Sequence, residues 1–401
     1  MKKVLKLKNI KLINFKKFIL NEKLNEIHII NGIITNNFES KQINDQSLVI
    51  DCTNCIVSPG FIDPQINGLD DCNFWETPSF NTIDKLRLKL AHCGVTGFCP
   101  TIITSSKENI LKSIDHINSY LKESKEHPGA EILGIHLEGI FITKYGVHNK
   151  SLVETELIVK NLEPYVNNKN IIIFTLAPEL DKTGEAIKYL HKNKILVSIG
   201  HSNASYKEGE RAIKEYGIKS VTHMFNGLKG VEGFSHRSEE KTNLNLLIEK
   251  LKDANKVNPE DDGIVLSILK SNSVHCMAIS DGIHVHPEVL KYLYKIKGPN
   301  QFSLVSDLVA KSFFEEAKQK EMLAGGQITI DKCVANLINW NIDTVENCLK
   351  SASSSTLNLL KNCRDIDIEY LKTGHLVIWN TEKNTVKGTI IGEDVFLNDE
   401  T

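Results

Sequence analysis

The fold of this chain is decided by residues 195–228, which read ILVSIGHSNASYKEGERAIKEYGIKSVTHMFNGL. The apolar run 195–199 predicts a buried strand, and residues 206–216 predict a helix that ends at Gly217. A second strand-like run follows this helix. A strand, a helix and a strand within about 30 residues have the size of one βαβ unit, whose crossover makes the two strands parallel and usually adjacent.

Polar residues follow both strands of this unit. Ser202 and Asn203 offer oxygens that can cap the helix. His201 comes directly after the first strand and His223 ends the second, so we expect the two imidazoles at the same end of neighbouring strands. A single histidine at a strand end is more often a hydrogen-bonded structural residue than a metal ligand. Two histidines in equivalent positions favour a shared metal ion.

The composition is that of an ordinary globular protein. The 401 residues are 41% hydrophobic and 24% charged, and the net charge of -2 gives no electrostatic footprint for nucleic acid or an anionic membrane. No run approaches about 18 apolar residues, and the basic first residues lack the features of a signal peptide. Nine scattered cysteines fit reduced thiols. We therefore expect a cytoplasmic protein with a small-molecule partner that binds neither nucleic acid nor membranes.

Strand-like runs alternate with helical segments through the middle of the chain. Eight buried strands alternating with helices over roughly 250–300 residues predict an α/β protein with a (β/α)8 barrel of the TIM type, and a doubly wound open sheet is the alternative. Neither G-x-G-x-x-G nor G-x-x-x-x-G-K-[ST] occurs, so nucleotide-phosphate loops are not supported. The eight runs are 56–66, 94–104, 131–138, 171–179, 195–201, 220–225, 275–280 and 302–307.

Short β-rich runs occur near both ends of the chain, for example at 4–7 and 27–30 and again at 375–379 and 388–392. We expect the two ends to come together in one small β-sandwich domain, because chain termini often lie close together. The expected domains are 1–55 plus 372–401 for the β-sandwich and 56–371 for the barrel.

In a (β/α)8 barrel the active site lies at the C-terminal ends of the strands. Most of the predicted strands of this chain end in a carboxylate, an amide or an imidazole. Burying such groups costs free energy unless they are paired or bound to a metal. The residues at these strand ends are Asp63, Gln65, Asn67, His136, Glu138, His201, His223, Asp281, His284 and Asp307.

Three of these side chains form the ligand set of a catalytic zinc. Glu138, His201 and His223 supply one carboxylate and two imidazoles, and they leave a fourth position for water, whose pKa zinc lowers to about 7. A hydrolase also needs a base that takes the water's proton and returns it to the leaving group, and Asp307 is placed for that role. Taken singly, Glu138 fits a salt-bridged carboxylate and Asp307 fits a helix cap. Together in one barrel mouth, these residues predict a metal-dependent hydrolase.

Eight short motifs follow one another along nearly the whole chain, and although each is weak alone, their joint order is specific. They are PGFIDPQING (59–68), GVTGFCPTIITS (94–105), GIHLEG (134–139), TLAPE (175–179), GHSNAS (200–205), THMFNGL (222–228), SDGIHV (280–285) and LVSDLVA (304–310). With these motifs the chain resembles the N-acetylglucosamine-6-phosphate deacetylases of the amidohydrolase superfamily.

The resemblance implies a deformed (β/α)8 barrel with a small β domain built from both chain ends. It implies hydrolysis of the acetamide of N-acetylglucosamine 6-phosphate to glucosamine 6-phosphate and acetate, a step of amino-sugar catabolism. The family's metal ligands fall on Glu138, His201 and His223, and its catalytic acid/base falls on Asp307. One divalent metal per subunit is expected, with zinc first and iron, cobalt or manganese as alternatives.

The resemblance also implies a set of substrate contacts. In the family, the equivalent of Arg237 reaches the phosphate of the neighbouring subunit's substrate, which implies a homodimer. An arginine can donate a bidentate pair to a phosphate, and the plainer interpretation of Arg237 is a surface arginine. His148 and His284 are candidates to orient the acetyl carbonyl or the sugar hydroxyls. The family contacts fall on Val147, His148, Asn226, Gly227, Arg237, Asp281, Gly282, Ile283, His284, Leu323, Ala324 and Gly325.

Gln65 and Asn67 indicate how many metals the site takes. Many amidohydrolases carry His-x-His on the first strand, where residues i and i+2 face the same way and bind a second metal. Amides are much poorer zinc ligands than imidazoles. We therefore expect a single metal, with Gln65 and Asn67 nearby as hydrogen-bonding groups.

The chain departs from the family pattern at three places. Ile140 replaces the proline that usually follows His-Leu-Glu-Gly, which removes a restraint on φ. Residues 238–240 replace an acidic-Pro-Gly sequence. The span from Asp307 to Leu323 is shorter than usual and lacks strands that the family lends to its β domain. Two other functions therefore stay open: a related amidohydrolase that acts on another N-acetyl sugar or a linear amide, and a non-catalytic sugar-phosphate-binding relative.

Overall fold

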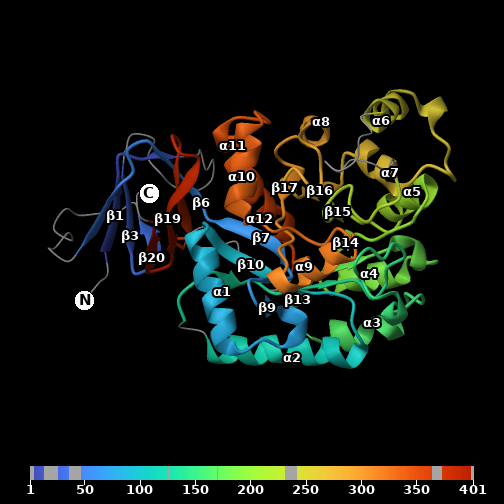
Figure 1. The fold of residues 1–401 in the computed structure, drawn as a ribbon, viewed down its shortest axis with the longest axis horizontal. Coiled ribbons are helices and arrows are strands. Elements are labelled where there is room, and N and C mark those ends of the chain that lie inside the picture. The colour runs from blue at the N-terminus through green and yellow to red at the C-terminus, as the bar shows by residue number, and fades with distance from the viewer. Residues whose placement is uncertain are drawn as a thin grey trace.

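The computed structural model describes residues 4–12, 26–35, 47–124, 127–168, 170–230, 242–363 and 373–398. Figure 1 shows a β-sandwich at one side of the molecule and a larger α/β body at the other. In the part of the chain that is described, no helix combines the length and the apolar character that a membrane span requires.

The α/β body is built on a nearly closed parallel barrel, as the sequence predicts. Among the described residues, eight strands pair in the order β7-β10-β12-β13-β14-β15-β16-β17, and β11 adds to β10. A single bridge between Ile66 and Leu308 links β7 to the chain after β17, so the open doubly wound sheet is excluded. The strands are β7 (Phe61–Ile66), β10 (Val95–Ile102), β11 (Glu131–Ile132), β12 (Ile135–Glu138), β13 (Ile171–Leu176), β14 (Leu196–Ile199), β15 (Ser220–Val221), β16 (His275–Ala278) and β17 (Phe302–Leu304).

The barrel strands are covered on both faces. In β13, which reads IIIFTL, every residue is buried, and such continuous apolar runs are typical of parallel strands between helices. The helices are α1 (Phe80–His92), α2 (Lys107–Glu123), α3 (Val159–Val166), α4 (Glu185–Lys192), α5 (Tyr206–Lys214), α6 (Thr242–Lys252), α7 (Ile264–Lys270), α8 (Pro287–Lys297), α9 (Lys311–Gln319), α10 (Ile330–Asn339), α11 (Val345–Ala352) and α12 (Ser354–Leu360). Short 3-10 turns are η2 (Phe74–Glu76), η3 (Lys150–Leu152), η4 (Pro178–Leu180) and η5 (Ala254–Lys256).

Helix α5 begins with a capping box that lies later than the sequence suggested. The Ser205 hydroxyl accepts the amide of Glu208 at 3.3 Å, and the Glu208 carboxylate accepts the amide of Ser205 at 2.9 Å. The expectation that Ser202 and Asn203 cap this helix was wrong. Both residues instead bind Glu179, because the Ser202 hydroxyl and the backbone N–H of Asn203 donate hydrogen bonds to its carboxylate.

The two ends of the chain build the β-sandwich together. One sheet has the order β4-β3-β1-β5, and the other has the order β2-β6-β18-β19-β20. Buried side chains from both sheets, including Leu7, Ile29, Val57 and Ile378, form the core between them. The strands are β1 (Val4–Lys8), β2 (Lys11–Leu12), β3 (Glu26–Ile30), β4 (Ile33–Thr35), β5 (Leu48–Asp51), β6 (Cys55–Pro59), β18 (Leu376–Asn380), β19 (Thr385–Ile391) and β20 (Asp394–Leu397).

The expected first strand, 56–66, is two strands. Residues 55–59 pair with β18 of the sandwich, and residues 61–66 pair with β10 of the barrel. The apolar run is continuous because both segments are buried, so the sequence pattern does not reveal where one sheet ends and the next begins. A small hairpin, β8 (Gly68–Leu69) with β9 (Cys72–Asn73), follows β7.

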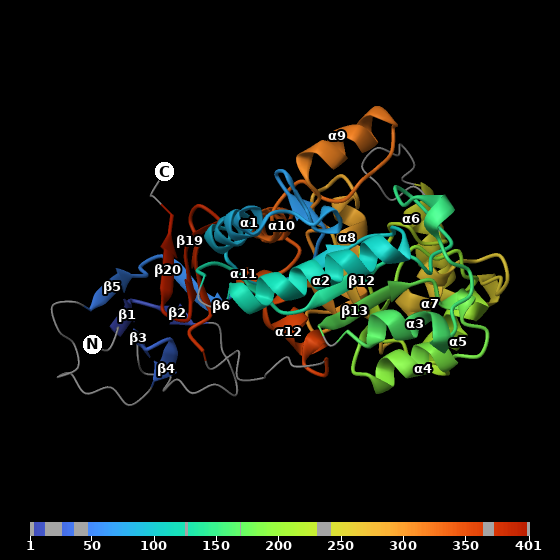
Figure 2. The same cartoon turned by 90° about the horizontal axis from the view of Figure 1, so that it is seen from below.

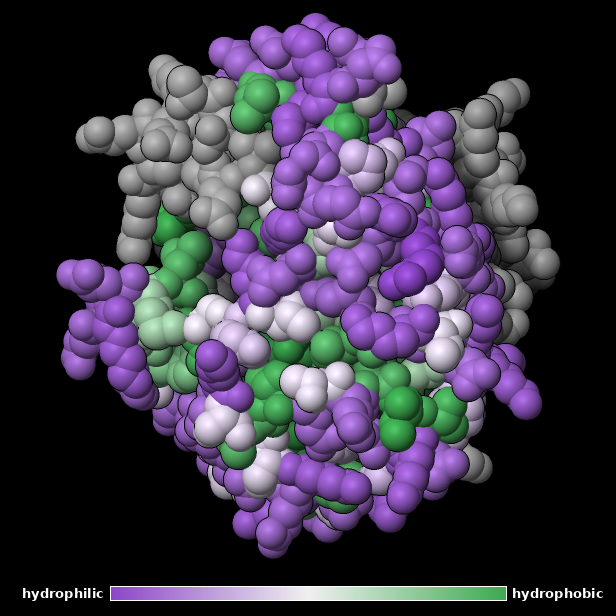
Figure 3. Space-filling model, turned by 90° about the vertical axis from the view of Figure 1, so that its right-hand side faces the viewer, coloured by the Kyte–Doolittle hydropathy of each residue, from purple (hydrophilic) through white to green (hydrophobic). Residues whose placement is uncertain are grey.

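The span between Asp307 and Leu323 forms helix α9, which lies apart from the helices that surround the barrel (Figure 2). Its place is at the end of the barrel where β17 finishes. Figure 3 shows one face of the molecule covered mostly by hydrophilic residues, with hydrophobic residues gathered in a band below its centre.

Candidate active site

Three residues of the predicted reaction centre have a left-handed backbone. The φ angles are 50° at His201, 28° at His223 and 52° at Asp307. Such a conformation costs a non-glycine residue on the order of 1–3 kcal/mol and is concentrated at functional sites. Strands β14 and β15 pair in parallel, so the two histidines follow adjacent strand ends, as expected.

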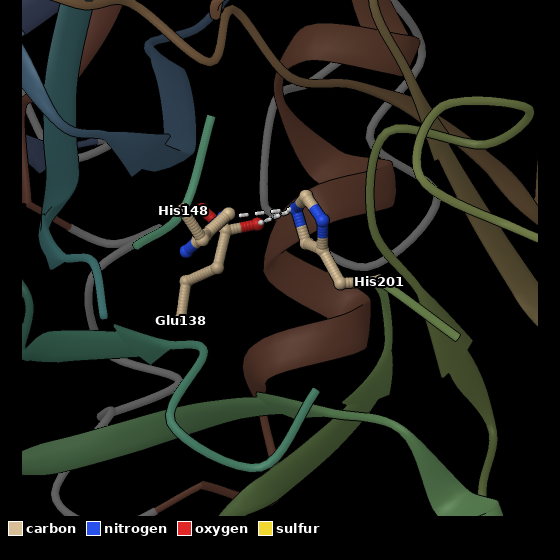
Figure 4. A group of neighbouring side chains, drawn as sticks. All are labelled: Glu138, His148 and His201. Atoms are coloured by element: carbon tan, nitrogen blue, oxygen red, sulfur yellow. Dashed lines mark hydrogen bonds and ion pairs between the residues drawn. The ribbon is translucent and has the colours of Figure 1, made fainter. Parts of the chain in front are cut away.

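Four side chains with metal-ligating atoms meet in the barrel mouth. Oε1 of Glu138 lies 2.8 Å from Nε2 of His223 and 3.5 Å from Nε2 of His201. Nε2 of His148, in turn, lies 3.2 Å from Nε2 of His201. Figure 4 shows Glu138 and His148 side by side and facing His201, and their ligand atoms lie within 4.8 Å of one another. All four residues are buried, and the geometry therefore offers one candidate ligand more than the three predicted.

The hydrogen bonds of the outer ring nitrogens distinguish these histidines. Nδ1 of His201 lies 2.9 Å from the carbonyl oxygen of Lys144, and Nδ1 of His223 lies 3.1 Å from that of Asn226. A carbonyl only accepts, so each Nδ1 carries a hydrogen. In the neutral ring, Nε2 then has the free lone pair that a metal needs.

His148 has the opposite arrangement. The Thr104 hydroxyl oxygen accepts a hydrogen bond from the backbone N–H of Ile140 at 3.1 Å and lies 2.9 Å from Nδ1 of His148. Donation of the hydroxyl hydrogen to Nδ1 satisfies both buried groups, which leaves the ring proton on Nε2. Burial and the nearby His201 lower the pKa of His148 to about 3, so this ring is neutral. His148 is therefore a hydrogen-bond donor toward the centre of the site, and His201 and His223 are the two rings whose Nε2 is available to a metal.

The charges of Glu138 and His223 are those of an ion pair. Burial opposes the charge of Glu138, but its contacts with His201 and His223 hold its pKa well below the usual range. Burial also opposes the charge of His223, but the hydrogen bond and the charge of Glu138 raise its pKa to about 9. A carboxylate with two imidazoles is a donor set that fits a divalent cation of the zinc type.

Two amides hold the predicted acid/base. Nε2 of Gln65 donates to Oε2 of Glu138 at 2.8 Å and to Oδ1 of Asp307 at 2.7 Å, and Nδ2 of Asn67 donates to the same Oδ1 at 2.7 Å. Oδ1 is therefore occupied, and among the described residues no hydrogen bond engages Oδ2 of Asp307. Burial, together with the charge of Glu138, raises the pKa of Asp307 above its ordinary value. Oδ2 is thus the oxygen of Asp307 that can take and return a proton.

The barrel mouth contains a cavity of about 300 Å³, which is lined by Asn67, Glu138, His148, His201, His223 and Asp307. Further polar lining comes from Lys144, Asn226 and His284, and apolar lining comes mainly from the residues Trp75, Ile103, Val147, Val309, Phe313, Met322 and Leu323. A pocket of this size with a few convergent polar groups is typical of small-molecule sites.

His284 is a buried cation at the edge of this cavity. Its Nδ1 lies 2.7 Å from Oδ2 of Asp281, and its Nε2 lies 2.6 Å from the carbonyl oxygen of Ala324. Both partners are acceptors, so both ring nitrogens carry a hydrogen. Burial disfavours the charge, but the hydrogen bond and charge of Asp281 outweigh it and raise the pKa of His284. Despite burial, the same contact lowers the pKa of Asp281.

Known proteins resemble this chain over most of its length, although no family model matches it. An N-acetylglucosamine-6-phosphate deacetylase of Caenorhabditis elegans is 31% identical, over 90% of this chain and 87% of the relative. The chain belongs to the N-acetylglucosamine-6-phosphate deacetylase family. The Mus musculus member is 32% identical over 80% of this chain and 78% of the relative. The crystal structure of the Pasteurella multocida member covers 98% of this chain and 100% of its own, with a TM-score of 0.76 and 22% identity.

Most of the substrate contacts predicted from this deacetylase family lie at the cavity. Asp281 lies behind the cavity wall and holds His284. Gly282 and Ile283 are not among the lining residues, and Ile283 is 40% exposed. Arg237 and the altered residues 238–240 lie outside the described residues. The contacts that line the cavity are Val147, His148, Asn226, Gly227, His284, Leu323, Ala324 and Gly325.

The sequence did not indicate two residues that support the site. Thr104 fixes the ring of His148, as described above. The carboxylate of Glu179 accepts three hydrogen bonds: from the Ser202 hydroxyl at 2.7 Å, from the backbone N–H of Asn203 at 2.8 Å and from the Thr143 hydroxyl. It thereby joins the loop of His201 to the loop that follows Glu138. Both residues occur in the quoted motifs, but only the contacts across the barrel reveal what they hold.

The backbone at Ile140, where the family pattern has a proline, is in a conformation that proline cannot adopt. Its φ is 72° and its side chain is buried. Proline fixes φ near -65°, so a proline would not fit this conformation. The chain therefore turns differently here from a chain with proline at the same place, while Thr104 still accepts the amide of Ile140.

Proposed function

We propose that this chain is a metal-dependent deacetylase that hydrolyses the acetamide of N-acetylglucosamine 6-phosphate to glucosamine 6-phosphate and acetate. One observation carries the proposal: Glu138, His201 and His223 converge beside Asp307 in the mouth of a barrel of this family. The relatives are named N-acetylglucosamine-6-phosphate deacetylases. The cavity has the size of a small-molecule site.

Glu138, His201 and His223 would hold one divalent cation, for which we propose zinc. Such a cation, when bound, polarises a carbonyl and lowers the pKa of a water molecule that it binds. The carbonyl oxygens of Lys144 and Asn226 orient the two rings for this task. Gln65 and Asn67 donate to carboxylates, as we expected of amides at a site for one metal.

Asp307 moves the proton of the reaction. Its Oδ2 takes the proton of the attacking water while the water oxygen bonds to the acyl carbon, and the same proton goes to nitrogen as the C–N bond breaks. The products are a carboxylic acid and an amine, so atoms and charge balance. The two amide donors at Oδ1 keep the carboxylate in one orientation.

His148 stabilises the charge that develops on the acyl oxygen. Its ring is neutral and carries hydrogen on Nε2, which faces the centre of the site. A buried donor aimed at a developing oxyanion is worth about 10²–10³ in rate in other enzymes. Asp307 and His148 thus divide proton transfer and charge stabilisation between them.

The sugar phosphate would occupy the polar side of the cavity. Asn226 and Gly227 line this side, and His284 lies at its edge in an ion pair with Asp281. We propose that Arg237 binds the phosphate of the substrate in a neighbouring subunit, which makes the active form a homodimer, and that the enzyme works in the cytoplasm. Light scattering during gel filtration tests the dimer.

The test is acetate release by purified protein that has been depleted of metal and reloaded with zinc. We expect turnover of N-acetylglucosamine 6-phosphate, with little turnover of the unphosphorylated sugar or of a linear N-acetyl amide. Absence of acetate from the phosphorylated sugar, with metal bound, overturns the proposal.

A second candidate is an amidohydrolase that acts on another N-acetyl sugar or a linear amide. It is favoured by helix α9, which forms in the shortened span beside the cavity. Higher kcat/KM for one of the comparison amides would select this candidate. A measured content of zinc or iron well below one ion per chain would instead favour a non-catalytic sugar-phosphate-binding protein.

A further inference from the structure

One side of the cavity is an apolar wall made of Trp75, Val147, Val309, Phe313 and Met322. The rings of Trp75 and Phe313 meet edge to face, with centroids 5.1 Å apart. Val309 is buried, and Val147, Phe313 and Met322 pack against the cluster that contains it. The wall is therefore one continuous apolar surface and not a set of isolated side chains.

This apolar wall begins at the reaction centre. Val147 directly precedes His148, and Val309 lies two residues after Asp307. Of the polar lining groups, Asn226 and His284 come from segments that contribute nothing to the wall, whereas Lys144 lies three residues before Val147 in the same loop. An amide substrate extends in two directions from its carbonyl carbon, toward the acyl chain and toward the amine. A sugar phosphate is polar and matches the polar groups, so the acyl chain is the part that matches the apolar wall.

An acetyl group is small for this surface. It presents one methyl group, whereas the apolar wall exposes two aromatic rings, a methionine and two valines to the cavity. Phe313 comes from helix α9 and Met322 from the turn that follows it. The span between Asp307 and Leu323 thus supplies two of the five side chains of this surface.

We propose that the apolar wall is an acyl subsite that accepts N-acyl chains longer than acetyl, with N-propanoyl- and N-butanoylglucosamine 6-phosphate as substrates. This inference rests on the proposed function, because it concerns the same reaction at the same site. The bond changes are unchanged: the water oxygen bonds to the acyl carbon, the C–N bond breaks, and the proton passes through Asp307 to nitrogen. Each methylene that the wall removes from water raises kcat/KM by up to about fourfold.

The experiment compares kcat/KM for the acetyl, propanoyl and butanoyl substrates in the zinc-loaded wild type and in Phe313→Ala. We expect kcat/KM to rise with chain length in the wild type. Phe313→Ala should lower it for the butanoyl substrate by about tenfold and for the acetyl substrate by less than about threefold. Phe314→Ala is the matched control, because Phe314 is the neighbouring half-buried phenylalanine of α9 and is not among the lining residues.

Two kinetic results overturn the acyl subsite while leaving the proposed function intact. One is turnover of the acetyl substrate with butanoyl turnover below about a tenth of it. The other is an equal loss for all three substrates in Phe313→Ala, which would mean that the apolar wall contacts the sugar or only supports the fold.

A binding measurement covers the case in which no substrate is turned over and the proposed function fails. Calorimetry on zinc-loaded Asp307→Asn compares the affinities for the acetyl and butanoyl compounds. Tighter binding of the butanoyl compound supports the subsite, and it should be lost in the Asp307→Asn, Phe313→Ala double variant. Equal or weaker binding, or no binding of either compound, overturns it.

Discussion

The hydroxyl of Thr104 lies 2.9 Å from Nδ1 of His148, on the side of the ring away from His201. The hydroxyl also accepts the amide of Ile140, so its hydrogen is directed to the ring. This contact makes His148 a donor at Nε2, whereas backbone carbonyls leave the Nε2 lone pairs of His201 and His223 available to a metal. The partner of Nδ1 thus sets whether the Nε2 of each of these three histidines donates or accepts.

Thr104→Val should lower kcat by about tenfold or more, because His148 loses the partner that keeps hydrogen on Nε2. The zinc content of the variant should stay at the wild-type level, since Thr104 contacts no metal ligand. Thr104→Ser retains the hydroxyl and is the control. Steady-state kinetics with metal analysis check both values, and equal activity of the two variants would remove Thr104 from this role.

Asp307→Asn should keep its metal and lower kcat by about 10² or more, because an amide cannot carry the proton from water to nitrogen. Asn67→Ala should have a smaller effect on kcat, since Gln65 still donates to Oδ1. Activity of Asp307→Asn near the wild-type level would contradict the proton-transfer role.

Zinc binding should release about one proton from the protein at pH 7. The contact with Glu138 raises the pKa of His223 to about 9, and a metal ligand must be neutral. The proton is bound below this pKa, so zinc affinity should rise with pH and level off above about 9. Calorimetry in buffers of different ionisation enthalpy counts the protons. Proton release that does not change between pH 7 and pH 10 would contradict this origin.

Asp281→Asn should lower the pKa of His284 and weaken the fold near pH 6. The raised pKa of His284 contributes stability below the ordinary histidine pKa of 6.5, and this stability is lost as the pH rises through the folded pKa. The lowered pKa of Asp281 contributes stability above the ordinary aspartate pKa of 3.8, and this stability is lost at lower pH. The variant should therefore lose about 1.5–3 kcal/mol at pH 6 and less at pH 9. Denaturant unfolding at the two pH values measures the difference, and equal losses would contradict the pairing.

Glu179→Ala should weaken zinc binding by about 10–100-fold, because Glu179 holds the loop that carries His201. Glu185→Ala, at an exposed position of α4, is the matched control. Competition with a chromogenic chelator measures the affinity. Unchanged affinity in Glu179→Ala would show that the loop keeps its position without the carboxylate.

The sequence predicts the barrel well because its strands are buried on both faces. Such strands are apolar runs, and the polar residue at the end of each run marks the barrel mouth. Glu138, His201, His223 and Asp307 could be found in this way, since their position relative to a strand is local information. The same reasoning fails at residues 56–66, where one apolar run serves two sheets.

The supporting contacts could not be predicted, because they join residues far apart in the chain. Thr104 and His148 are 44 positions apart, and Ser202 and Glu179 are 23 apart. The first residue of α5 was predicted correctly, but its cap was misplaced, since Ser202 and Ser205 have the same capping chemistry and only the contact with Glu179 separates them. Helix α9 lies where the family pattern suggested missing strands, and its local sequence did not reveal that Phe313 would face Trp75.

The pairing of β6 with β18 places Cys55 opposite Asn380. On the ribosome, therefore, the first part of the protein waits for nearly the whole chain to be made before its sheet is complete. The barrel can assemble during this wait, because its strands pair with neighbours in order of synthesis. A chain that is truncated before β18 would have an unpaired edge on β6, and unpaired strand edges promote aggregation.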